Sequence, residues 1–199
     1  PTVMSNPFIR LRNDNKQHGV CYNAPYIPLT TIKRELKGEQ MKNALVQLVD
    51  NINKVPMDKD STSNISHPYW LFPPSPPPSP TGWSITRISG GITNDLYLIT
   101  HTTVPLGISG EGVLIRLFGA EGVIDRDEET SLYAELCRDN IAYKYLGRFG
   151  TPPEEGCGRI EGFLEGYRPL DKSDFHSPSM SKMIAIEMSK VHKFVPPPP

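Results

Sequence analysis

The sequence has few cysteines, no excess of charge of either sign and no long apolar run, and each absence excludes a class of protein. Cys21, Cys137 and Cys157 lie far apart without CxxC spacing, so we expect reduced thiols and neither a disulfide framework nor a zinc site. The 21 basic and 22 acidic residues leave a net charge of -1. A protein that binds nucleic acid or an anionic membrane through a basic face would carry more positive charge.

Membrane insertion and export are also disfavoured. No stretch approaches the roughly 18 apolar residues that a membrane-spanning helix needs, and residues 1–16 lack the apolar run of a signal peptide. We therefore expect a cytoplasmic protein without a membrane span. The length of 199 residues predicts one domain or two, with enough chain to bury a core.

Proline is abundant, with 21 of 199 residues, about twice the usual share of roughly 5%. Ten of these prolines lie in the runs 73–80 and 196–199. Proline lacks a backbone donor and has a fixed φ, so PPSPPPSP favours polyproline II and excludes a helix or sheet interior. Together with the polar residues 57–67, it predicts a linker over residues 55–81. An alternative is that its PxxP spacing binds an SH3 or WW domain.

Residues 1–54, before this linker, are predicted to be an N-terminal extension with a short edge strand and one amphipathic helix. The strand would include Tyr26, Ile27 and Leu29. The helix is predicted over Gly38–Asn53, and its apolar residues recur at helical spacing on one face: Met41, Leu45, Leu48, Val49 and Ile52. This spacing is typical of a packing helix.

Residues 82–166, after the linker, alternate short apolar runs with glycine turns and predict an α+β domain. Five strands are expected, over Trp83–Ile88, Leu96–Thr100, Val113–Phe118, Tyr143–Phe149 and Gly158–Leu164. They would form an antiparallel sheet against a helix at Asp125–Asp139. Residues 167–199 are predicted as a connector and a last helix, Ser179–Phe194, with Ile184, Met188 and Val191 on one face.

The loop SGGITN at residues 89–94 is the first candidate binding site. Paired glycines let a backbone approach a ligand closely and point successive amides at phosphate oxygens, and Thr93 and Asn94 add side-chain donors. It is not a Walker A motif, because no Gly-Lys-Ser/Thr follows. A plain hairpin turn explains the glycines equally well.

Arg116 is the second candidate, because every neighbour in VLIRLF is apolar. Its guanidinium must find an anion or face solvent from an edge strand. The available carboxylates are Asp127, Glu128 and Glu129. Alternatively, DRDEE is only the solvated start of a helix, where acidic residues favour the helix dipole.

The segment Glu161–Gly166 is the third candidate. An extended chain at the end of a strand leaves backbone N–H and C=O groups free, as recognition of an adenine edge requires. A strand followed by an ordinary loop is the alternative.

The sequences of these segments resemble those of the ethanolamine kinase and choline kinase family. GGITNDLYLI, VLIRLFG, IDRDEETSLYAEL and IEGFLEGYRPL occur in the order of that family's motifs, and YLGRF and IAIEMSKVHKF are also similar. The resemblance covers about residues 82–195 and is to the N-terminal lobe of a protein-kinase-like fold, although VAIK and GxGxxG are absent. GITN together with DRDEE resembles the ethanolamine branch.

The resemblance implies an ATP site. It assigns the loop over the ATP phosphates to Gly90, Gly91, Ile92, Thr93 and Asn94. Arg116 would contact phosphate oxygens and Glu129 would orient it. Glu161, Gly162 and Phe163 would hold the adenine through backbone groups, with the Phe163 ring as a wall. Tyr143 departs from the proline that the family usually has before the fourth strand.

The family's catalytic strings are absent. Phosphoryl transfer needs a carboxylate for the attacking hydroxyl and ligands for Mg²⁺, and no HxDxxxxN or DFE occurs, since only KFVPPPP follows His192. With Pro1 at its start, the chain is therefore expected to be an incomplete N-terminal lobe that is inactive alone. The full enzyme would make phosphoethanolamine from ATP and ethanolamine. The alternatives are a choline kinase, a non-catalytic nucleotide-binding or interaction module, and a proline-rich adaptor.

Overall fold

The computed structural model describes residues 26–27, 29–53, 81–88, 93–103, 106, 112–119, 124–150, 156–164, 166–168 and 170–195. These residues form the strands β1 (Tyr26–Ile27), β2 (Trp83–Ile88), β3 (Asn94–His101), β4 (Val113–Phe118), β5 (Tyr145–Phe149) and β6 (Gly158–Gly162). They also form the helices α2 (Gly38–Asn53), α3 (Arg126–Arg138), α4 (Lys172–His176) and α5 (Pro178–Lys193). The predicted linker up to residue 80, its PxxP run and the final prolines lie outside the described residues.

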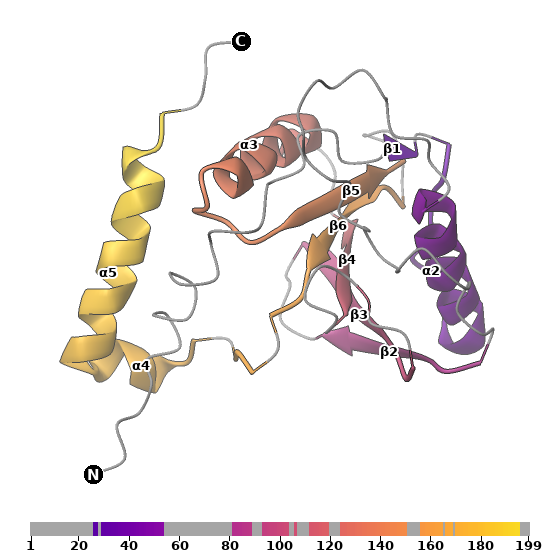
Figure 1. The fold of residues 1–199 in the computed structure, drawn as a ribbon, viewed down its shortest axis with the longest axis horizontal. Helices are drawn as coiled ribbons and strands as arrows, with labels where there is room; N and C mark the ends of the chain where they lie inside the picture. Colours follow the sequence, from indigo (N-terminus) through magenta and orange to yellow (C-terminus); the bar gives the residue numbers. More distant parts are fainter. Residues whose placement is uncertain are drawn as a thin grey trace.

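The strands form one sheet in the order β1-β5-β6-β4-β3-β2 (Figure 1). β2 to β6 pair antiparallel, as expected. The predicted edge strand forms at Tyr26–Ile27 and joins this sheet parallel to β5, so the sheet has six strands and not the five expected. The N–H of Gly150 donates to the Ile27 carbonyl at 2.9 Å, and the Arg148 guanidinium lies 4.0 Å from the centre of the Tyr26 ring. Both contacts attach β1 to the otherwise open edge of β5.

Helix α2 has the predicted bounds and covers one face of the sheet. Its apolar stripe is buried in one cluster with side chains of the sheet. The cluster members on α2 are Met41, Leu45, Leu48, Val49 and Ile52, and those on the strands include Tyr97, Ile99, Val113, Ile115, Leu117, Leu146, Phe149 and Ile160. The predicted extension and the predicted domain after the linker therefore share a hydrophobic core.

Helix α3 lies on the other side of the sheet from α2 (Figure 1). Asp125 is its N-cap and accepts a hydrogen bond from the Glu128 N–H at 2.9 Å, so the helix begins where the acidic run predicts. Side chains alternate along a strand. Ile115 and Leu117 of β4 therefore face the α2 core, whereas Arg116 between them points to the α3 side.

The C-terminal residues form two helices, of which only α5 was expected. The short helix α4 begins with a capping box formed by Asp171 and Asp174. Helix α5 has no buried residue, and Ile186, Met188 and Val191 are each more than two-fifths exposed. In Figure 1 both helices stand apart from the sheet. None of the helices in the described ranges is long and apolar enough to cross a membrane.

Candidate functional site

Arg116 forms a two-point ion pair with Glu161 on the neighbouring strand. Its Nε donates to Glu161 Oε1 at 2.7 Å and its Nη2 to Oε2 at 3.3 Å. Only 22% of the Arg116 side chain and 6% of that of Glu161 are exposed. The Nη1 group of Arg116 has no acceptor in the part of the chain that the structure describes. One side of the guanidinium is therefore fixed while donors remain on the other.

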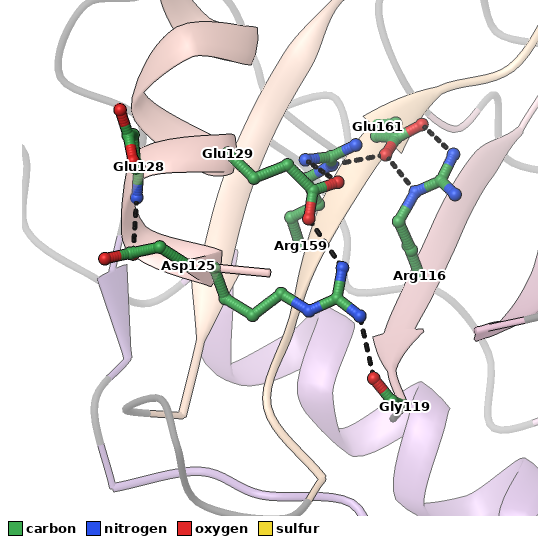
Figure 2. A network of polar contacts seen from close by, with 8 residues as sticks. Arg116, Gly119, Asp125, Glu128, Glu129, Arg159 and Glu161 are labelled. Carbon is green, nitrogen blue, oxygen red and sulfur yellow. Dashed lines mark hydrogen bonds and ion pairs between the residues drawn. The ribbon is translucent and has the colours of Figure 1, made fainter. Parts of the chain in front are cut away.

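The predicted pairing of Arg116 with Glu129 was wrong. Glu129 Oε2 accepts from Arg126 Nη1 at 2.6 Å, and Glu129 Oε1 lies 3.3 Å from Arg159 Nη1. Figure 2 shows Glu129 reaching from the helix towards Arg159, with Glu161 between Arg159 and Arg116. Strand pairing explains the difference, because β4 and β6 are adjacent in the sheet and Glu161 faces Leu114, two residues from Arg116.

The other two candidate carboxylates lie elsewhere. Asp127 Oδ1 accepts from Arg148 Nη1 at 2.9 Å at the surface, and Glu128 is exposed. The solvated-helix interpretation of DRDEE therefore holds for these two residues and fails for Glu129.

Arg159 is the centre of the network. Its Nε donates to Glu161 Oε1 at 2.6 Å, and its guanidinium lies 4.2 Å from the centre of the Tyr133 ring. Its side chain is 5% exposed. Arg126, at the start of α3, extends the network by donating from Nη2 to the Gly119 carbonyl at 2.7 Å. The network thus joins α3 to β6, to β4 and to Gly119, the residue that follows β4.

The network contains more basic than acidic side chains. Burial raises the pKa of Glu161, but hydrogen bonds and charge from Arg116 and Arg159 outweigh it, so the pKa lies below its usual value. The pKa of Arg116 lies above its usual value, since Glu161 outweighs the effect of burial. Three guanidinium groups (Arg116, Arg126, Arg159) against two carboxylates (Glu129, Glu161) leave one net positive charge. Such a cluster suits an anion.

Two residues of the predicted glycine loop lie within the described chain. Gly90, Gly91 and Ile92 lie outside it, Thr93 is a bend and Asn94 is the first residue of β3. Asn94 pairs with Phe118 in the sheet. Its buried Oδ1 accepts no hydrogen bond from the described residues, and a buried acceptor of this kind needs a donor from elsewhere.

Two of the three predicted hinge residues make contacts within the chain, and the adenine contact of all three stays a prediction. The Glu161 side chain is used within the network, and the Gly162 N–H donates to the Lys144 carbonyl at 2.9 Å. A Cβ on Gly162 would meet the Tyr143 ring at 2.7 Å, so the unusual Tyr143 packs directly on this glycine. Phe163 is half-buried and follows the strand. Its backbone makes no hydrogen bond to another backbone group in the described ranges.

Arg159, Arg126 and Tyr133 were not among the predicted site residues. Arg159 and Glu161 are two positions apart in GRIEG, and this spacing places both on one face of a strand. Two charged residues at alternate positions of a predicted strand were the sequence signal that could have identified Arg159 as a partner of Glu161. Their partners on α3 could not be identified without the packing of the helix. No group of three or more His, Cys, Asp or Glu residues in the described chain is arranged to hold a metal ion.

Comparison with known proteins now gives the family. The model of the Choline/ethanolamine kinase family matches residues 85–197, more than half of the chain. The chain belongs to this family. Its members are kinases, and the range agrees with the predicted resemblance over about residues 82–195. The matched range includes Arg116, Glu129, Arg159 and Glu161, whereas β1 and α2 precede it.

Three relatives indicate how much of a family protein this chain covers. It is 34% identical to a probable ethanolamine kinase A of Dictyostelium discoideum over 57% of this chain and 31% of the relative. It is 34% identical to a probable ethanolamine kinase of Arabidopsis thaliana over 56% of this chain and 28% of that protein. It is 30% identical to the choline kinase of Saccharomyces cerevisiae over 57% and 18%. The chain spans less than a third of each.

Two solved structures are also similar. The ethanolamine kinase of Plasmodium vivax matches with a TM-score of 0.47 and 22% identity over 83% of this chain and 42% of that chain. The choline kinase of Cryptosporidium parvum matches with a TM-score of 0.44 and 23% identity over 56% and 29%.

Proposed function

We propose that this chain is the nucleotide-binding N-terminal lobe of an ethanolamine kinase. The observation that supports this most is Arg116, a partly buried guanidinium that Glu161 holds on one side and whose Nη1 donors on the other side have no acceptor among the described residues. The full enzyme would transfer the γ-phosphoryl group of ATP to the ethanolamine hydroxyl. The hydroxyl oxygen forms the new P–O bond, the bond to the ADP oxygen breaks, and the hydroxyl proton leaves to a base. The phosphoethanolamine product would enter the CDP-ethanolamine route to phosphatidylethanolamine.

The residues fit the phosphates of ATP. The surplus positive charge of the network and the Nη1 of Arg116, which donates to no described residue, suit an anion. We propose that Gly90, Gly91, Ile92, Thr93 and Asn94 surround the phosphates, and that Asn94 Oδ1 gains a donor when the loop encloses a ligand. Phe163 remains the proposed adenine contact through its backbone and ring. Glu129 and Glu161 are proposed to position Arg116, and Gly162 to shape the hinge beside Tyr143.

Mg²⁺ would neutralise phosphate charge during transfer. The described residues lack a cluster that could hold it, and the sequence contains neither HxDxxxxN nor DFE. We therefore propose that residues outside this sequence supply the metal ligands and the base, and that this chain alone transfers no phosphoryl group.

Ethanolamine is proposed over choline because two of the relatives above are named probable ethanolamine kinases and because GITN and DRDEE resemble that branch. A choline kinase is the second candidate, since a choline kinase also matches at 30% identity. A non-catalytic interaction module is the third, and the exposed apolar residues Ile186, Met188 and Val191 of α5 favour it.

The test is a titration of the 199-residue chain with a fluorescent ATP analogue. Arg116→Met should weaken binding by about tenfold, as expected for a charged hydrogen-bonding group. Arg148→Met is the matched control, because Arg148 lies in the same sheet and pairs with the surface residue Asp127. Wild-type chain that binds no ATP, or equal loss in both variants, would contradict the proposal. Phosphoethanolamine formation by the chain alone would contradict its expected inactivity.

A further inference from the structure

We propose that Arg159 is a positioning residue that couples helix α3 to the guanidinium of Arg116 through two carboxylates. This inference rests on the proposed function, because it assigns Arg159 a task within the nucleotide site. Arg159 would touch no phosphate itself. It would determine where Arg116 can place its free donors.

The first link is between Arg116 and Glu161. Both oxygens of Glu161 accept from Arg116, at 2.7 Å and 3.3 Å. A two-point contact fixes the plane of a guanidinium as well as its distance. The orientation of the remaining Nη1 group therefore depends on where the Glu161 carboxylate lies.

The second link is between Glu161 and Arg159. Glu161 Oε1 accepts from the Nε of both arginines, at 2.7 Å from Arg116 and 2.6 Å from Arg159. Arg116 and Arg159 also face each other across the β4–β6 pair. Like charges at such positions repel, and the shared carboxylate offsets this repulsion. Without Arg159, Glu161 would have one cation instead of two and could follow Arg116 outwards.

The third link is between Arg159 and α3. Glu129 and Tyr133 lie one helical turn apart, and Arg159 contacts both, at 3.3 Å from Glu129 Oε1 and 4.2 Å from the Tyr133 ring centre. The Arg159 Nη1 is buried and within ion-pair distance of Glu129 but lacks hydrogen-bond geometry. The contact with Glu129, at 3.3 Å, is longer than the contact of Arg159 with Glu161, at 2.6 Å. A movement of α3 would therefore break the contact between Arg159 and Glu129 first.

Loss of this coupling would affect the binding of phosphates and not the binding of adenosine. A displaced Arg116 would lose contact with phosphates, whereas the adenosine part of a nucleotide would bind as before. If Arg159 only stabilised the fold, its substitution would weaken the binding of ATP and of adenosine to the same degree. The ratio of ATP affinity to adenosine affinity therefore separates positioning from general loss of structure.

The experiment measures both affinities for the 199-residue chain and three variants. Arg159→Lys keeps the charge but replaces the three nitrogens of the guanidinium with one, so it cannot bridge Glu129 and Glu161 as arginine does, and Glu129→Gln removes the negative charge that faces Arg159 from α3. Each should lower ATP affinity by about five- to tenfold, the scale of one ordinary hydrogen bond, and change adenosine affinity by less than twofold. Asp127→Asn is the control on the same helix, because among the described residues Asp127 forms an ion pair only with Arg148, outside the network. It should change neither affinity.

A second measurement needs no ligand. Shifts of the urea unfolding midpoint for Glu161→Gln and Arg159→Lys should be non-additive in the double variant, whereas those for Glu161→Gln and Asp127→Asn should add. Parallel losses of ATP and adenosine affinity, or unchanged ATP affinity in Arg159→Lys, would overturn the coupling alone. Wild-type chain that binds neither ligand would overturn the proposed function and with it the task of Arg159.

Discussion

Leu48→Ala in helix α2 tests whether the segment before the family match belongs to the same folded unit. Leu48 is fully buried among side chains of the sheet, although it precedes the matched residues 85–197. Leucine and alanine have nearly equal helix propensity. A loss of stability would therefore come from the contacts between α2 and the sheet and not from the helix itself.

The expected magnitude follows from burial. Truncating a buried leucine to alanine costs about 2–5 kcal/mol, because apolar contacts are lost and a cavity remains. With a urea slope of about 1–3 kcal/mol per molar, a loss of about 3 kcal/mol lowers the unfolding midpoint by roughly 1–3 M. A domain of this size has a stability of only about 5–15 kcal/mol, so the shift should be unmistakable.

The assay is urea unfolding of the 199-residue chain followed by far-ultraviolet circular dichroism. Gln47→Ala is the matched control, since Gln47 is the exposed neighbour on the same helix. Its midpoint should move by little, because surface substitutions rarely exceed about 0.5 kcal/mol. If Leu48→Ala unfolds at the same urea concentration as Gln47→Ala, the shared core is wrong.

Two further predictions concern titrating groups. Because the folded-state pKa of Glu161 lies below its ordinary value of 4.5, its ion pairs stabilise the fold at neutral pH and are lost as pH falls below that value. The free energy of unfolding should therefore fall more steeply on acidification in the wild type than in Glu161→Gln, and parallel curves would exclude the effect. Burial raises the pKa of Cys137 to about 12, and its Sγ donates to the Tyr143 carbonyl at 2.6 Å. Peptide mapping after iodoacetamide treatment should show Cys137 labelled in concentrated urea but hardly in the native chain, and equal labelling would contradict its burial.

Much of the local structure could be predicted from the sequence. The bounds of α2, β2 and β4 agree with the expected ranges, because apolar periodicity and flanking glycines are local signals. The predicted strands at Tyr143–Phe149 and Gly158–Leu164 were too long by two residues each. β3 was predicted too short, as Asn94 and Asp95 lie in it despite their low strand propensity. Pairing with β4 outweighs that propensity.

The candidate site divides in the same way. Arg116 could be selected from one strand alone, because a charge among apolar neighbours needs a partner. Its partner could not, since the three carboxylates considered lie together in DRDEE, whereas the β4–β6 register selects Glu161. Arg126 likewise bonds to Gly119 only because α3 begins beside the end of β4.

The sequence by itself determined the family, the order of the elements and the absence of the catalytic strings, since motifs and periodicity are properties of neighbouring residues. The pairing of the predicted edge strand with β5, the shared core of α2 and the ion pairs of Arg116 and Arg159 were decided only by the tertiary structure. Each depends on residues tens or more than a hundred positions apart, such as Tyr26 beside Arg148 or Arg116 beside Glu161. Contacts at such separations arise from strand register and helix packing, to which local patterns do not extend.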